Sequence, residues 1–200
     1  MSLLDHEKKN VRKEAAWVLS NIAAGTQAQI GQVLSNGRMQ DVLNLSLNAV
    51  WEIRKECIWV LSNIASGGSD EQVASLVSLG AIHSLVTVLD MNDTKMTIVA
   101  LEAIESILEV GDRQGHEYVA FLDESNGISA IESLQEHESE QVYNKALEII
   151  EKFLGVDDEE EENLAPEVDG DTFSFGVNPA KLCPTNDNVM QHTTFNFAAI

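Results

Sequence analysis

Two stretches of the chain place a tryptophan and an asparagine at the same spacing. Trp17 is followed four residues later by Asn21, and the pair recurs 42 residues further on as Trp59 and Asn63. Residues four apart lie on one face of a helix, one turn above the other. Adjacent indole rings can hold the aliphatic stems of Lys or Arg and attract their cations, while an Asn amide can pair with a peptide backbone. These residues predict a surface that binds a basic, extended chain.

An acidic residue completes the pattern in each copy. Glu14 precedes Trp17 by three residues and Glu56 precedes Trp59 by three, so each carboxylate shares a helix face with its indole. Glu56 would then meet the charged tip of a ligand side chain. The alternative interpretation is structural, with each Trp in the core and each Asn a polar residue near a helix end. Packing does not require a row of exposed asparagines, which favours the binding interpretation.

The pattern stops after its second copy. The equivalent positions of the following long helices hold Glu102 and Ser106, and then Glu148 and Lys152. Because these side chains offer neither an indole nor a carboxamide, the predicted Trp/Asn surface covers two neighbouring helices and ends after residue 63.

The helices that carry these residues belong to a repeat. "RKEAAWVLSN" from Arg12 and "RKECIWVLSN" from Arg54 are near copies, 42 residues apart. A period of this length is typical of armadillo and HEAT repeats, which are built from two or three helices. Glycines punctuate each period into two short helices and one long third helix. We therefore expect an all-α solenoid with three helices per repeat, whose long helices stack side by side.

The repeat divides the chain into five segments. We expect the third helix of a truncated armadillo repeat at 1–25, repeats at 26–68 and 69–115, a degenerate terminal repeat at 116–155, and a tail at 156–200. The tail combines an acidic run with scattered prolines and little periodicity, which predicts a mostly disordered acidic segment. Since the first segment offers no cap for a solenoid end, we expect the C-terminal piece of a longer solenoid.

Composition limits the classes of partner. The 200 residues include 12 basic and 33 acidic side chains, for a net charge of -21. Such a chain would repel phosphate, so we expect a basic partner and no nucleic acid. No apolar run reaches membrane-spanning length, so we expect no membrane partner. Two distant cysteines argue against a disulfide framework and suit a reducing, intracellular environment.

The repeated motifs resemble one protein family. "KEAAWVLSNIAAG" and "KECIWVLSNIASGG", with "EQVASLVSLG", "VYNKALEIIEKFLG" and the acidic "DDEEEEN", are similar to consecutive armadillo repeats of importin-α (karyopherin-α), the adaptor that binds nuclear localisation signals. The resemblance implies a right-handed superhelix whose long third helices line a concave groove. It further implies that the two Trp/Asn helices form part of the minor of the family's two signal-binding sites.

The resemblance also assigns roles to individual residues. Two tryptophans would flank Lys or Arg side chains, and two asparagines would hold the peptide backbone. One glutamate would meet a cation, and a serine would be a secondary contact. These peptide-binding residues are Trp17, Ser20, Asn21, Glu56, Trp59 and Asn63.

Further partners are implied by the same resemblance. The family binds importin-β through a basic N-terminal segment that is not part of this sequence. The segment 117–170 resembles the region used by the recycling export receptor and by nucleoporins. A protein with these partners would shuttle between cytoplasm and nucleus.

Catalysis finds no support in the sequence. The five histidines have no partner at metal-ligand spacing, and there is no nucleophile motif or phosphate-binding loop. We expect no enzyme activity, no cofactor and no metal. The alternative to a transport adaptor is a generic armadillo scaffold for protein–protein interaction, in which the Trp and Asn residues only hold the stack.

Overall fold

The structure, a computed structural model, describes residues 3–155, 167–169 and 172–174. The chain divides into two units, Met1–Gly155 and Val156–Ile200. In the described part of the first unit every element is helical. These elements are η1 (Leu3–Asp5), α1 (Lys9–Ala23), α2 (Gln27–Ser35), α3 (Met39–Asn48), α4 (Trp51–Gly67), α5 (Asp70–Ser78), α6 (Ala81–Leu89), α7 (Thr94–Gln114), α8 (Tyr118–Glu124), α9 (Gly127–Ser133), η2 (Leu134–Glu136), α10 (Glu140–Ile149) and η3 (Ile150–Leu154).

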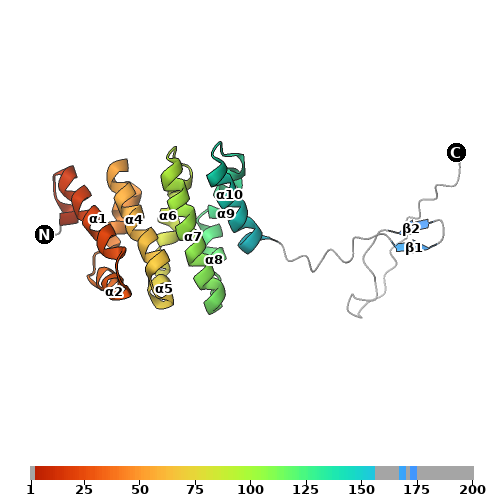
Figure 1. Cartoon of the computed structure of the whole chain (residues 1–200), viewed down its shortest axis with the longest axis horizontal. Helices are drawn as coiled ribbons and strands as arrows, with labels where there is room; N and C mark the ends of the chain where they lie inside the picture. Colours follow the sequence, from red (N-terminus) through yellow and green to blue (C-terminus); the bar gives the residue numbers. More distant parts are fainter. Residues whose placement is uncertain (1–2, 156–166, 170–171, 175–200) are drawn as a thin grey trace, which may run out of the picture. The chain divides into compact units, whose positions relative to one another are not determined.

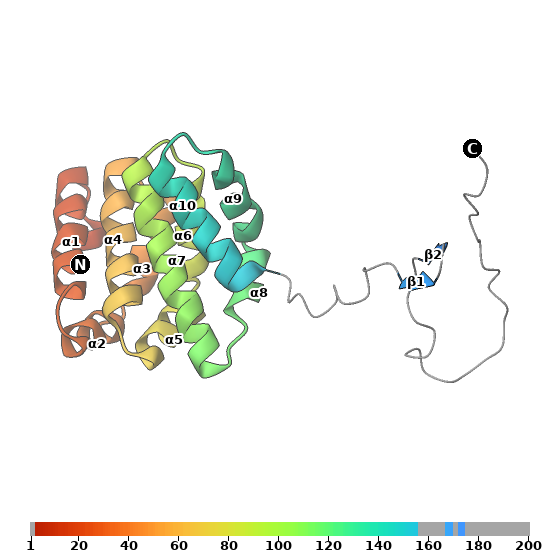
Figure 2. The same cartoon turned by 45° about the vertical axis from the view of Figure 1, so that its right-hand side comes forward.

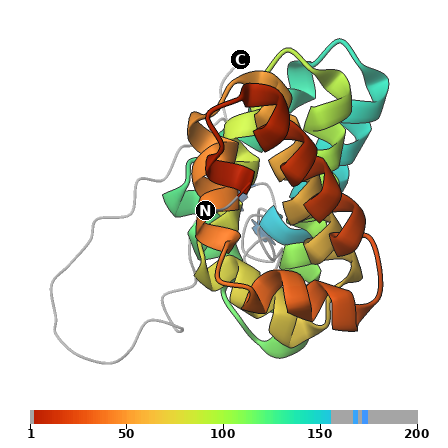
Figure 3. The ribbon, with the colours of Figure 1, turned by 90° about the vertical axis from the view of Figure 1, so that its left-hand side faces the viewer.

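The long helices form one layer of the first unit. α1, α4, α7 and α10 lie side by side in this order (Figure 1 and Figure 2). The shorter helices follow the same progression, since α2 contacts α5 and α3 contacts α6. Viewed along the stack, the later helices lie behind the first ones (Figure 3). Because each three-helix group contacts its neighbours in the sequence, this unit is a solenoid.

The packed face of the long helices is apolar, and in α4 it is covered by a neighbouring long helix on each side. Val60 and Leu61 of α4 are fully buried, since α4 contacts both α1 and α7. The residues at the same positions of α1 are Val18 and Leu19, and Val18 is 47% exposed. Among the described residues, α1 has a stacked long helix on one side only, which leaves part of its apolar face open.

Ion pairs on the surface join residues about one period apart, in one case between successive repeats and in another within a repeat. Lys9 Nζ lies 2.9 Å from Glu52 Oε1, and Arg113 Nη2 lies 2.8 Å from Asp70 Oδ1. Both pairs span 43 residues of sequence. Because water and salt screen these exposed pairs, they contribute little to stability. Lys9–Glu52 joins the long helices α1 and α4, whereas Arg113–Asp70 joins α7 to the short helix α5.

A satisfied polar network ties the other layers to α4. The Ser46 hydroxyl of α3 donates to Ser84 Oγ of α6 at 2.9 Å. From α4, Arg54 Nε donates to the Ser46 carbonyl at 2.7 Å and Nη2 donates to Thr87 Oγ1 at 3.1 Å. Each buried polar group thus has a partner, which offsets its desolvation cost.

Local chemistry determines where the first short helix of a repeat begins. The Thr26 hydroxyl accepts the N–H of Gln29, whose side chain accepts the Thr26 N–H in return. Ser69 and Gln72 form the same reciprocal pair before α5. This capping box satisfies backbone N–H groups that have no partner inside the helix.

The turn into the second short helix needs a left-handed backbone conformation in each repeat. Gly37, Gly80 and Asn126 occupy this turn with φ of 72°, 92° and 57°. Glycine adopts positive φ without steric cost, and asparagine is the side chain that tolerates it best. The same turn geometry therefore persists in the third repeat, where Asn126, directly before Gly127, adopts the positive φ.

In the second unit, β1 (Glu167–Asp169) pairs antiparallel with β2 (Thr172–Ser174). The register sets Val168 opposite Phe173. The sequence analysis did not predict this hairpin, although the Gly-Asp dipeptide between the strands is typical of two-residue hairpin loops. The rest of the predicted disordered tail lies outside the described residues.

Candidate peptide-binding site

The two tryptophans lie on neighbouring helices, one on α1 and one on α4. Trp17 is 50% exposed. Trp59 is half-buried, because part of its ring packs against the core. Since neither indole is sealed in the interior, both remain accessible to a ligand from solvent.

The two asparagines keep part of their amide groups available. Asn21 Nδ2 donates to the Trp17 carbonyl of its own helix at 2.9 Å, and Asn63 Nδ2 donates to the Ser20 carbonyl of α1 at 2.9 Å. Within residues 3–155, neither Oδ1 atom accepts a hydrogen bond. Each side chain can therefore still accept from a peptide N–H, and the Asn63 bond fixes the orientation of its amide across the two helices.

Ser20 differs from the role that the resemblance implies. It is only 6% exposed, and its hydroxyl donates to the Trp17 carbonyl at 2.8 Å. The α4 helix that packs over α1 accounts for this burial. The geometry does not favour a direct contact with a ligand. Instead, the Ser20 carbonyl accepts the Asn63 amide, which leads us to predict a positioning role for Ser20.

Glu56 is the carboxylate closest in sequence to Trp59, and it is half-buried. It forms no ion pair with any described residue. Its negative charge acts on the adjacent buried thiol, because burial and then the Glu56 charge raise the pKa of Cys57 to about 12. Glu56 is thus a carboxylate without a counter-ion that a ligand cation can approach.

A lysine that the sequence analysis did not select also belongs to this site. Lys95 Nζ, from the first turn of α7, lies over the Trp59 ring at 5.5 Å from its centroid. Lys95 and Trp59 line a cavity of about 180 Å³, and the other lining residues are Lys55, Glu56, Asp93 and Met96. Lys95 belongs to the next repeat and follows no Trp/Asn spacing, so the sequence pattern gave no signal for it.

The array ends after α4, as the sequence predicted. On α7, Glu102 is exposed and the Ser106 hydroxyl donates to the Glu102 carbonyl. In η3, which directly follows α10, Lys152 pairs with Glu109 of α7 at 2.6 Å. These positions thus offer no further indole or carboxamide.

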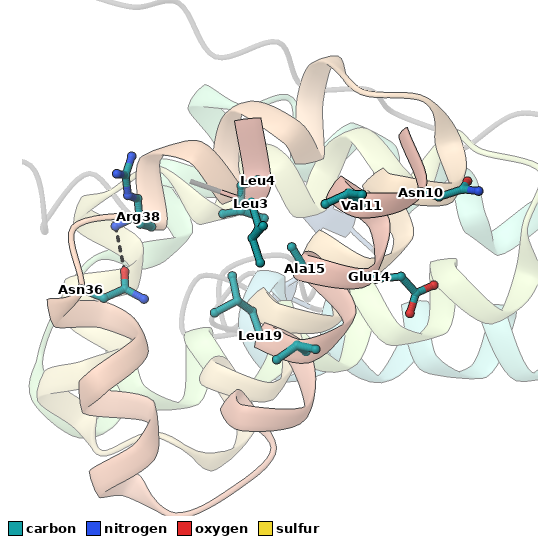
Figure 4. Close-up of a pocket in the computed structure, with 10 residues that line it drawn as sticks. Leu3, Leu4, Asn10, Val11, Glu14, Ala15, Leu19, Asn36 and Arg38 are labelled. Carbon is teal, nitrogen blue, oxygen red and sulfur yellow. Dashed lines mark hydrogen bonds between the residues drawn. The ribbon is translucent and has the colours of Figure 1, made fainter. Parts of the chain in front are cut away.

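A second, larger cavity lies elsewhere, on the open side of α1 (Figure 4). It has a volume of about 560 Å³, and its lining includes Leu3, Leu4, Val11, Val18 and Leu19. Its mostly apolar side chains offer little chemistry beyond hydrophobic contact. Val11, Val18 and Leu19 are the α1 counterparts of residues that are buried in α4, so this cavity reflects the open face of α1.

Metal and membrane sites receive no support within the described ranges. No group of three or more His, Cys, Asp or Glu side chains there could hold a metal ion. No single described helix is long and apolar enough to cross a membrane. Among the helices that the structure describes, only α5 and α6 together satisfy that criterion, but they meet at 77° and bury their apolar side chains in the solenoid.

Comparison with known proteins identifies the repeats. An "Armadillo/beta-catenin-like repeat" family matches residues 1–24, and an "Atypical Arm repeat" family matches residues 116–167. Importin subunit alpha-4 of Arabidopsis thaliana is 40% identical over 190 residues, covering 89% of this chain. The chain is built of importin-α armadillo repeats. Importin subunit alpha-1a of Oryza sativa subsp. japonica is 37% identical over 88% of the chain. In both cases the match spans 35% of the relative's length.

Solved structures support the same architecture. A designed armadillo repeat protein in complex with the peptide (KR)4 superimposes with a TM-score of 0.65 at 33% identity, over 74% of this chain and 60% of the other. A second designed armadillo repeat protein gives 0.65 at 31% identity over the same shares of both chains. The prediction of an all-α armadillo solenoid of the importin-α type is therefore confirmed. The exact repeat boundaries and the roles of the six predicted site residues remain predictions.

Proposed function

We propose that the face of α1 and α4 that carries Trp17, Asn21, Trp59 and Asn63, called the groove below, binds basic, extended peptides of the nuclear-localisation-signal type. The observation that carries this proposal is that two stacked helices present the same pair of groups to solvent. Trp17 and Trp59 are accessible, and Asn21 and Asn63 each retain an unused amide oxygen.

Each group has a definite task in this mechanism. The stem of a ligand Lys or Arg lies between the two indoles, and its cation gains about 0.5–2 kcal/mol from cation–π attraction. The asparagine oxygens accept peptide N–H groups, which holds the backbone extended along the groove. Glu56 supplies the negative charge that favours a cationic tip over a neutral one.

The relatives' names support a wider role. We infer that the chain acts as part of a non-enzymatic nuclear import adaptor that shuttles between cytoplasm and nucleus. The peptide-bound designed protein supports a basic peptide as ligand for such a solenoid. Because the chain spans 35% of the length of these relatives, the partners importin-β, the recycling export receptor and nucleoporins are proposals for the whole protein.

The test is a calorimetric titration of the (KR)4 peptide into the 200-residue chain at low and high salt. We expect binding that weakens with salt, because a net charge of -21 attracts the cationic peptide and salt screens that attraction. Trp59→Ala should weaken binding at least about 5-fold, as expected for the loss of a cation–π contact of about 1 kcal/mol and its apolar area.

A matched control removes an exposed aromatic ring outside the groove. Phe121 of α8 is 49% exposed, so Phe121→Ala changes exposed aromatic surface without touching α1 or α4. Binding that is absent, or that falls equally in Phe121→Ala and Trp59→Ala, contradicts the proposal and favours a generic scaffold.

A further inference from the structure

We propose that the α7 side of Trp59 is a second cation subsite, which the protein fills with its own Lys95. This inference rests on the proposed peptide-binding function. It adds that the groove admits a ligand cation between Trp17 and Trp59, whereas the position beyond Trp59 is closed by an internal competitor.

The position of Lys95 places it on the side of Trp59 away from α1. α4 lies between α1 and α7 in the stack, and Lys95 stands in the first turn of α7. Its Nζ atom is 5.5 Å from the centroid of the Trp59 ring, within the range of cation–π attraction. Lys95 therefore makes the contact that the proposed mechanism assigns to a ligand side chain.

The cavity around this contact has the chemistry of a cation site. It holds about 180 Å³ beside the indole, and its acidic residues are Glu56 and Asp93. Asp93 is already engaged by Lys55 Nζ at 3.6 Å and by Trp51 Nε1 at 3.3 Å. Glu56 has no ion pair among the described residues, so it is the acid left to a cation over Trp59.

The preceding pair of helices lacks this arrangement. α4 begins at Trp51 and α7 at Thr94, so Glu52 is the α4 residue that corresponds to Lys95. Glu52 pairs with Lys9 of α1 at 2.9 Å, and no described cation lies over Trp17. No described cation thus occupies the α4 side of Trp17, in contrast to the α7 side of Trp59.

A competing internal cation predicts a measurable consequence. A peptide cation that enters the second subsite must first displace Lys95, so it exchanges one cation–π contact for another and gains little. Lys95→Met keeps an unbranched apolar side chain but removes the charge. This variant should bind (KR)4 about 3- to 10-fold more tightly than the wild-type chain, because the vacated subsite becomes available to the peptide.

The experiment measures (KR)4 affinity by calorimetry for the wild-type chain, Lys95→Met, Lys8→Met and Lys95→Met combined with Trp59→Ala. Lys8 is exposed and its side chain contacts no described acid, so Lys8→Met matches the change in charge without opening a subsite. The expected result is a gain for Lys95→Met, less than about 2-fold change for Lys8→Met, and no gain in the double variant.

Other outcomes separate this inference from the proposed function. Trp59-dependent binding that is equal in Lys95→Met and Lys8→Met overturns the second subsite and leaves the peptide-binding groove intact. The absence of binding in every variant overturns the proposed function, and the subsite with it.

Discussion

The bond from Asn63 to the Ser20 carbonyl gives the most discriminating prediction. Asn63→Ala removes a hydrogen bond between two repeats, whereas Asn21→Ala removes only a bond within its own helix. Both residues lie near the end of a long helix, so the gain in helix propensity of about 0.5 kcal/mol on replacing Asn by Ala is shared by the two variants. Their difference in unfolding free energy therefore isolates the bond between the helices.

The magnitude follows from the partners of the Ser20 carbonyl. A partly buried hydrogen bond contributes about 0.5–1.5 kcal/mol net, with the upper values arising where a partner is left unsatisfied. The Ser20 carbonyl also accepts the N–H of Ala24 at 3.0 Å, so it keeps one partner after Asn63→Ala. We therefore expect Asn63→Ala to be about 0.5–1 kcal/mol less stable than Asn21→Ala.

Urea unfolding of both variants, monitored by the circular dichroism of the helices, measures this difference. The two variants should have the same m-value, which is the dependence of the unfolding free energy on urea concentration. Asn21→Ala serves as the control, since it makes the same chemical change on the adjacent helix. If Asn63→Ala unfolds at the same urea concentration as Asn21→Ala or a higher one, Asn63 does not couple the two repeats and the positioning role of Ser20 is wrong.

Three further predictions follow from burial and charge. Val60→Ala should cost about 2–3 kcal/mol of unfolding free energy, whereas Val18→Ala, at the equivalent but half-exposed position, should cost under about 1 kcal/mol; equal urea midpoints would contradict the stacking account. The Cys57 thiol, with its pKa raised to about 12 by burial, should react with a thiol reagent at pH 8 only after unfolding, in a variant that lacks the other cysteine; labelling of the folded chain would contradict its burial. The pKa of Asp70 lies below its usual 3.8, mainly because Arg113 donates a hydrogen bond to its carboxylate and, to a smaller extent, because Gln114 does so too. The stability it contributes is therefore present above that value and lost as the pH falls below it, so Asp70→Asn should flatten the acid limb of the stability curve; an unchanged limb would contradict the contact.

The periodicity of the sequence was sufficient to predict the helical stack. The 42-residue spacing of the two Trp/Asn pairs follows from stacked long helices, and the glycine-punctuated turns recur at Gly37 and Gly80. Because these features depend on local residue types or on the repeat period, they can be predicted from a single sequence. The accessibility of Trp17 follows from the same helical spacing.

The remaining features of the site depend on contacts between repeats. Ser20 lies next to Asn21 in the sequence, yet α4 buries it, and no property of α1 alone indicates this. The contact of Lys95 with Trp59 joins residues of different repeats through side-chain directions that periodicity does not specify. Sequence spacing therefore predicted a candidate binding face, but it did not indicate the burial of Ser20 or the contact of Lys95 with Trp59.

The indole N–H signals of the three tryptophans test the central claim most directly. Trp17 and Trp59 belong to the proposed groove, whereas Trp51 donates its indole N–H to Asp93 and serves as an internal control. In a titration of the 15N-labelled chain with (KR)4, we expect saturable shifts of the Trp17 and Trp59 signals and a much smaller shift of the Trp51 signal. Saturable binding that leaves Trp17 and Trp59 unshifted, or that shifts Trp51 most, would show that the peptide does not bind between these two helices.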